Sequence, residues 1–171
     1  LILAAIAFLL YANTLSHDYT VDDATVLANN KQTIQGVKAI PDIFTSSYRK
    51  GFWDRKESLY RPLSVAMFAV EWQIAPNNPH LSHWINVILY AITGAVLFNF
   101  LKTLFNENKI YLAFFVALLF IVHPIHTEVV ANIKGRDEIL SFLFSVLAMF
   151  FLTKGFDKEN MGLNILCGTC F

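Results

Sequence analysis

Apolar and polar residues alternate along this chain in long blocks. Mostly apolar residues cover 1–15, 81–105, 110–122, 139–153 and 161–171. An α-helix rises ~1.5 Å per residue and the hydrocarbon core of a bilayer is ~30 Å thick. The block at 81–105 is long enough to cross a membrane alone, and the pattern predicts five membrane helices, the last of them incomplete.

The shorter apolar blocks leave room for other interpretations. The block 1–15 is too short for a span of ~20 residues, so we expect a truncated first helix in a piece of a longer protein. The alternative is the apolar core of a signal peptide, but Asn13-Thr14-Leu15-Ser16 is a poor cleavage site. The block 110–122 is also short, and snorkelling by Lys109 can offset the mismatch.

Two polar loops, 16–79 and 123–138, separate these blocks. Their charges and backbone groups cannot be satisfied in hydrocarbon, so both loops must lie in water. If 81–105 and 110–122 form an antiparallel pair joined at Asn106, both loops emerge on one face. The opposite face carries a group of lysines that the positive-inside rule makes cytoplasmic: Lys102, Lys109, Lys154 and Lys158.

The first loop contains two segments with helical patterning. Pro41 and Asp42 favour a helix start. Aromatic residues follow with basic residues among them, namely Phe44, Tyr48, Phe52 and Trp53 with Arg49, Lys50, Arg55 and Lys56. This segment is predicted to be an amphipathic helix in the headgroup region, or a helix packed on other parts of the loop. A second interfacial helix is predicted at 63–74, ended by Pro76-Asn77-Asn78-Pro79. The predicted fold is all-α and polytopic.

Composition supports this class. Hydrophobic residues make up 56% of the chain and charged residues 15%, and the mean hydropathy is +0.49. These values are typical of an integral membrane protein. The counts of Lys+Arg and Asp+Glu are 13 each, so nucleic acid is not an expected partner.

The second loop is rich in ionisable groups. Pro124 is expected to stop the preceding helix, and Gly135 to take a positive φ that presents Arg136 at a turn. Asp137 and Glu138 then favour the start of the next helix.

Several short motifs occur together in a fixed order. They are Val21-Asp22-Asp23, Tyr60-Arg61-Pro62-Leu63, Asn77-Asn78-Pro79-His80 with Asn86, and His123-Pro124-Ile125-His126-Thr127-Glu128 with Gly135-Arg136. In this order they resemble the membrane half of the TMTC family, the transmembrane and tetratricopeptide-repeat-containing O-mannosyltransferases, which are similar in plan to other GT-C glycosyltransferases.

The resemblance implies a function. It implies transfer of a sugar, mannose by analogy, from a polyprenyl-phosphate donor to Ser or Thr hydroxyls of a protein acceptor. We expect no cofactor. It also implies tetratricopeptide repeats beyond the C-terminal end of this chain. The active loops would face the periplasm of a bacterial inner membrane or the lumen of the endoplasmic reticulum.

Such a transfer needs a carboxylate to take the acceptor proton. Asp22 and Asp23 are the candidates, with Asp22 preferred because related GT-C enzymes begin their acidic pair with Asp. The alternative is a purely structural role, in which the pair caps the N-terminus of a helix.

The departing phosphate needs a positive group. Arg61 and Arg136 are candidates, because guanidinium groups bind phosphate well. They can instead form ion pairs with the carboxylates nearby in sequence, Asp54, Glu57 or Asp137. The remaining residues assigned to substrate binding on the resemblance are Tyr60, His80, His126 and Glu128.

The histidines suggest a rival function. His80 and His83, with His123, His126 and Glu128, would share one face and could bind a catalytic zinc, as in a membrane metallohydrolase. No His-Glu-x-x-His motif occurs, so we expect no metal.

A third possibility is a transporter or assembly protein whose loops only bind. The spacing of Cys167 and Cys170 resembles a redox motif, but without a βαβ context we interpret them as ordinary membrane thiols.

Overall fold

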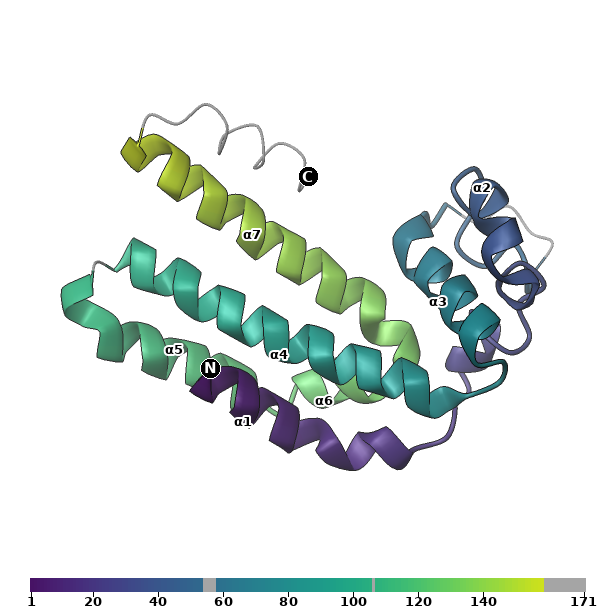
Figure 1. Ribbon diagram of the computed structural model, residues 1–171, viewed down its shortest axis with the longest axis horizontal. Helices are drawn as coiled ribbons and strands as arrows, with labels where there is room; N and C mark the ends of the chain where they lie inside the picture. The colour runs from purple at the N-terminus through teal and green to yellow at the C-terminus, as the bar shows by residue number, and fades with distance from the viewer. Residues whose placement is uncertain (54–57, 106, 159–171) are drawn as a thin grey trace. The chain divides into compact units, whose positions relative to one another are not determined.

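The computed structural model describes residues 1–53, 58–105 and 107–158, and every regular element in these ranges is helical (Figure 1). The predicted all-α class is therefore confirmed for this part of the chain. In chain order, the α-helices and the 3₁₀ helices (η) are α1 (Ile2–Tyr11), η1 (Ala12–Ser16), η2 (Asp23–Thr25), η3 (Thr33–Ala39), α2 (Ile40–Ile43), α3 (Pro62–Ile74), α4 (Pro79–Leu104), η4 (Glu107–Lys109), α5 (Ile110–Val122), α6 (His126–Ala131), η5 (Ile133–Gly135) and α7 (Arg136–Lys158).

Within the described ranges, two helical segments are long and apolar enough to cross a membrane. They are α4 and the segment Ile133–Gly155, which joins η5 to most of α7, whereas Ile2–Ser16 and α5 are shorter apolar helices. The helices predicted at 81–105, 110–122 and 139–153 are confirmed as helices. Their insertion in a bilayer stays a prediction, and the turn at Asn106 and the segment 161–171 with its two cysteines lie outside the described residues.

The chain forms two compact units. Unit 1 comprises Leu1–Ala12, Val87–Thr127 and Glu138–Phe171, and unit 2 comprises Asn13–Asn86 and Glu128–Asp137. Unit 2 therefore combines most of the first predicted loop with most of the second.

Small residues bring the helices of unit 1 close together. Ala7 of α1 and Ala113 and Ala117 of α5 are fully buried, and α1 packs against α5. On α4, a Cβ added to Gly94 would lie 2.7 Å from Cδ1 of Ile121. Small side chains allow this close approach, as is common where membrane helices pack.

Unit 2 has an apolar core of its own, and α3 packs on η3 within it. One face of α3 is buried through residues at helical spacing, with Val65, Phe68 and Ala69 in the core. Val26, Leu27, Ile43, Tyr48 and Ile133 are further members. The first loop is therefore a folded body.

The helix predicted to start at Pro41 and Asp42 is confirmed for its first turn, and its continuation through the aromatic residues to 53 is wrong. Helix α2 ends at Ile43 after one turn, and the chain continues in turns as far as 53. The N–H of Tyr48 donates to the Leu59 carbonyl at 2.8 Å, and that of Lys31 donates to the Gly51 carbonyl at 2.9 Å. These long-range hydrogen bonds replace helical ones, and Tyr48 is buried in the core.

The helix predicted at 63–74 is confirmed as α3, which begins one residue earlier, at Pro62. The chain reverses after it with Asn77 at a φ of 54°. Its placement at a membrane surface stays a prediction.

The positive φ predicted for Gly135 is also wrong. Among the described residues, the glycine with a positive φ is Gly36 and not Gly135. A Cβ at Gly135 would instead collide with the Val129 carbonyl oxygen and lie 2.9 Å from its carbonyl carbon. Gly135 is required because the end of η5 packs directly on the backbone of α6.

Candidate functional site

Asp23 joins the two predicted loops within unit 2. Its carboxylate is fully buried and accepts a backbone N–H on each oxygen, from Thr20 at 2.9 Å and from Lys134 at 2.8 Å. A buried carboxylate needs such donors, because leaving it unsatisfied would be costly. Asp23 therefore fixes the turn before η2 against the turn that contains Lys134.

Asp22 lies on the surface of the same turn. Its side chain is 61% exposed, and Oδ2 lies 3.0 Å from the Nζ of Lys134, whose side chain is 23% exposed. This hydrogen bond, followed by the charge of Lys134, lowers the pKa of Asp22 below its ordinary value of 3.8, and the charge of Arg49 acts in the same direction. Asp22 is ionised at neutral pH and open to solvent.

Neither aspartate side chain caps η2, so the alternative of a helix cap is not supported. Asp22 is the N-cap residue of η2, but its side chain makes no capping hydrogen bond. The side chain of Asp23 accepts from Thr20, which precedes η2. The two carboxylates have separate environments, one buried and structural, the other exposed and paired with a lysine.

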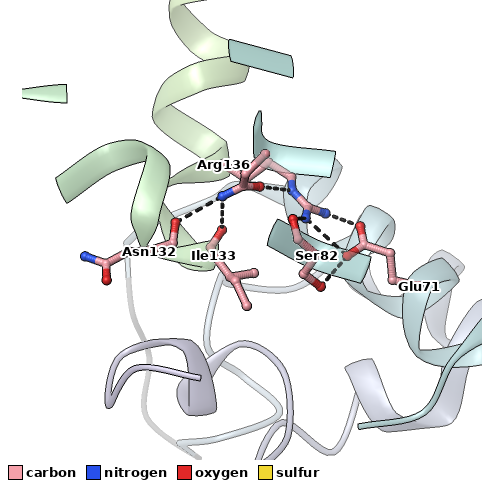
Figure 2. Close-up of polar contacts among 6 residues, drawn as sticks. Glu71, Ser82, Asn132, Ile133 and Arg136 are labelled. Carbon is pink, nitrogen blue, oxygen red and sulfur yellow. Dashed lines mark hydrogen bonds and ion pairs between the residues drawn. The ribbon is translucent and has the colours of Figure 1, made fainter. Parts of the chain in front are cut away.

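Arg136 lies in the interior of unit 2 and forms an ion pair with Glu71 of α3 (Figure 2). Nη1 contacts Oε1 of Glu71, and Nη2 donates to Oε2 at 3.1 Å and to the Ser82 carbonyl at 3.1 Å. The Ser82 hydroxyl donates to Oε2 at 2.5 Å. Arg136 is 0% exposed, and its carbon Cζ lies 4.4 Å from the ring centroid of Phe68.

Asn86 of α4 connects this ion pair to the second loop. Its Oδ1 accepts from Nε of Arg136 at 2.8 Å, and its Nδ2 donates to the carbonyls of Asn132 and Ile133 at 3.0 and 3.2 Å. The amide therefore orients the guanidinium and holds the chain just before Lys134. Burial and these partners favour a structural role for Arg136, and its contact with phosphate stays a prediction.

Arg61 forms one of the ion pairs considered from the sequence. Its Nη1 contacts Oδ2 of Asp137, and the two side chains are 38% and 6% exposed. The other partners considered, Asp54 and Glu57, lie outside the described residues. Tyr60 is exposed, and its hydroxyl donates to the Phe44 carbonyl at 2.7 Å.

The histidines and Glu128 have varied environments. His80 is exposed with Nδ1 3.1 Å from the Leu15 carbonyl, and His83 is buried. In unit 1, the His126 ring lies 4.4 Å from that of Phe120 between centroids, and burial, followed by the charge of His123, lowers its pKa. His126 is therefore neutral at pH 7. Glu128 is exposed.

The metal-site alternative gains no support from these positions. Over the residues described, no three His, Cys, Asp or Glu side chains are grouped so that they could hold a metal ion.

Sequence reasoning missed Lys134, Glu71 and Ser82 as parts of this site. Glu71 had a usable signal, because a single carboxylate inside an otherwise apolar helix needs a cationic partner when it is buried. Lys134 had none, because its contact with Asp22 joins residues 112 positions apart.

Comparison with known proteins gives relatives along the whole chain. The human protein O-mannosyl-transferase TMTC1 is 33% identical over 185 residues, which cover 99% of this chain and 21% of the relative. The mouse protein O-mannosyl-transferase TMTC2 is 30% identical, with 99% and 21% covered, and the protein O-mannosyl-transferase F38B6.6 of Caenorhabditis elegans is 31% identical, with 90% and 23% covered.

The chain thus spans about one fifth of the length of the curated relatives it matches. No family model matches the chain, and no solved structure matches it. These relatives bear the name of the family that the motifs resemble. Over almost its whole length the chain is TMTC-like, which confirms the family resemblance of its motifs.

Proposed function

We propose that this chain is part of a membrane glycosyltransferase of GT-C type that moves mannose from a polyprenyl-phosphate donor to Ser or Thr hydroxyls of a protein. The names of its relatives, protein O-mannosyl-transferases, support a sugar donor and a protein acceptor. The two long apolar segments, α4 and Ile133–Gly155, suit an enzyme whose donor is a membrane lipid.

The observation that carries the proposal is the pair of carboxylates with different environments. Transfer to a hydroxyl requires a base that is ionised at the working pH and accessible to the acceptor. Asp22 meets both conditions, because it is exposed and its pKa is lowered. Asp23, the next residue, holds the turn that carries Asp22 by accepting backbone hydrogen bonds from Thr20 and Lys134. In this proposal Asp22 is the general base and Asp23 positions it.

The chemistry balances with the groups of the site. The acceptor oxygen forms a bond to the anomeric carbon, and the bond from that carbon to the phosphate oxygen breaks. The acceptor proton goes to Asp22, and the electron pair of the broken bond stays on the phosphate. Tyr60, Arg61, His80 and Glu128 of unit 2, and His126 of unit 1, stay proposed substrate contacts, with the active loops on the periplasmic or lumenal face.

The donor and acceptor classes are tested together with the purified full-length enzyme in lipid nanodiscs. The donor is polyprenyl-phosphate mannose or, in a parallel reaction, nucleotide-linked mannose. The acceptors are an unfolded Ser/Thr-rich peptide and the same peptide with Ala at those positions. The proposal predicts mannosylation of the Ser/Thr peptide by the lipid-linked donor alone. Transfer from the nucleotide donor, or none from either, would contradict it.

A further inference from the structure

Three basic side chains of unit 2 lie close to the turn between α6 and α7, and they differ in how firmly they are held. Arg136 is 0% exposed, with donors to Glu71, Ser82 and Asn86. Arg61 pairs with a carboxylate that is itself buried, that of Asp137. Lys134 pairs with an exposed carboxylate and is itself partly exposed.

This difference decides which cation can change partners. Breaking a buried ion pair leaves a charge without solvent, whereas an exposed pair contributes little and is readily replaced by water or another anion. Lys134 also carries its ammonium on a flexible stem, while its backbone N–H remains bound to Asp23 at 2.8 Å. Its side chain can move while its backbone stays fixed.

We infer that Lys134 is shared between Asp22 and the donor phosphate: its ammonium pairs with Asp22 in the free enzyme and moves to the phosphate when the lipid-linked sugar binds. This rests on the proposed function. It assigns phosphate binding to a residue that the sequence did not single out, beside the base itself.

The charges of the reaction support this exchange. The donor phosphate is a diester with one negative charge, and it leaves as a monoester with two. Over the same step Asp22 gains the acceptor proton and becomes neutral, so one negative charge moves from Asp22 to the phosphate. An ammonium that moves in the same direction stabilises the leaving group. It also frees Asp22 to accept the proton only once a donor is present.

The test is binding of polyprenyl phosphate without a sugar to the full-length protein in phosphatidylcholine nanodiscs. A charged hydrogen bond to phosphate is strong, so Lys134→Met should weaken binding about tenfold or more, and Lys134→Arg should restore most of it. Lys38→Met, an exposed lysine of the same unit, should bind like the wild type.

A second variant tests whether Asp22 and the phosphate compete for the ammonium of Lys134. Asp22→Asn releases Lys134 from its competitor, so it should bind polyprenyl phosphate several-fold more tightly than the wild type, and Asp22→Asn with Lys134→Met should lose this gain. Equal or weaker binding by Asp22→Asn, or wild-type binding by Lys134→Met, would overturn the inference.

Two further outcomes separate the sources of failure. If phosphatidic acid competes as well as polyprenyl phosphate, the site recognises lipid phosphate in general and the assignment to the donor is overturned. Binding does not require turnover, so the binding changes can occur in an enzyme that transfers no mannose. That combination would contradict the proposed transferase and retain the phosphate site.

Discussion

Arg136 and Glu71 are 65 residues apart in the chain and form a buried ion pair with two N–H donors on one carboxylate. The pair connects the first turn of α7 to α3, and Ser82 and Asn86 of α4 satisfy the remaining polar groups around it. Asn86 also donates to the carbonyls of Asn132 and Ile133, so the pair is connected to the chain just before Lys134.

Removing one member of this pair should destabilise the protein strongly. Glu71→Leu leaves the guanidinium buried without its counter-charge, at a cost of about 3–5 kcal/mol. Replacing both, with Glu71→Leu and Arg136→Met, removes the unpaired charge and should recover much of the loss. The melting temperature of the detergent-purified protein measures both variants. A double variant less stable than Glu71→Leu alone would argue against this account of the pair.

Gly135→Ala should also be destabilising, because the added Cβ meets backbone atoms of Val129 that cannot rotate away. We expect a loss of about 1–3 kcal/mol, as for other overpacked sites. Gly94→Ala is the matched control, since its Cβ meets the flexible end of the Ile121 side chain. Thermal unfolding should show the larger loss for Gly135→Ala. Equal losses would contradict a backbone collision.

The apolar blocks predicted the helices of unit 1 well because a long apolar run has few other stable conformations near a membrane. The bounds of α5 agree with the predicted 110–122, and α4 differs from 81–105 by one or two residues at each end. Pro124 ends α5 as expected, since the helix stops at Val122.

The first loop was harder to predict because distant partners determine its conformation. The spacing of aromatic residues from Phe44 to Trp53 suits a helix. In the structure the N–H of Tyr48 instead donates a hydrogen bond to the Leu59 carbonyl, which takes the place of a helical hydrogen bond. The two arginines were recognised as cations that need partners. The sequence could not distinguish the buried pair of Arg136 from the partly exposed pair of Arg61, because burial depends on how α3 and α4 pack.

The pH dependence of transfer should report the pairing of Asp22. Its pKa is lowered in the folded protein, so the carboxylate persists below pH 3.8 and is lost as the pH falls through the folded value. The pH profile of kcat/KM for the donor reports the ionisation of the free enzyme, so its acid limb should have a midpoint below pH 3.8. In Lys134→Met the midpoint of this acid limb should shift to higher pH, toward 3.8, while the charge of Arg49 still keeps the pKa of Asp22 below that value. An unchanged limb would show that Lys134 does not act on the base.

The stability contribution of the same pair should be small, because Asp22 is mostly exposed and solvent screens the interaction. It is present above pH 3.8 and disappears as the pH falls through the lowered pKa. Lys134→Met should therefore change the melting temperature little at pH 7. A large loss would indicate a structural role that the exposed geometry does not explain.

Sidedness is predicted from the length of α4, which can cross a bilayer between the first loop and the turn near Asn108. In a background with Ser at Cys167 and Cys170, Lys50→Cys and Glu128→Cys should react with an impermeant thiol reagent from the same side. Asn108→Cys should react from the other side. Labelling of Lys50→Cys and Glu128→Cys from opposite sides would refute the shared face of the two loops.

The most direct measurement of the central claim is mannosyl transfer by Asp22→Asn in the full-length enzyme. Asn keeps the size of the side chain and removes its charge, and a general base contributes ~10²–10⁴-fold to rate. Asp42→Asn, an exposed aspartate at the start of α2, is the matched control. The account predicts that Asp22→Asn keeps its melting temperature and loses transfer by at least about a hundredfold, while Asp42→Asn stays active. Wild-type transfer by Asp22→Asn would contradict the account.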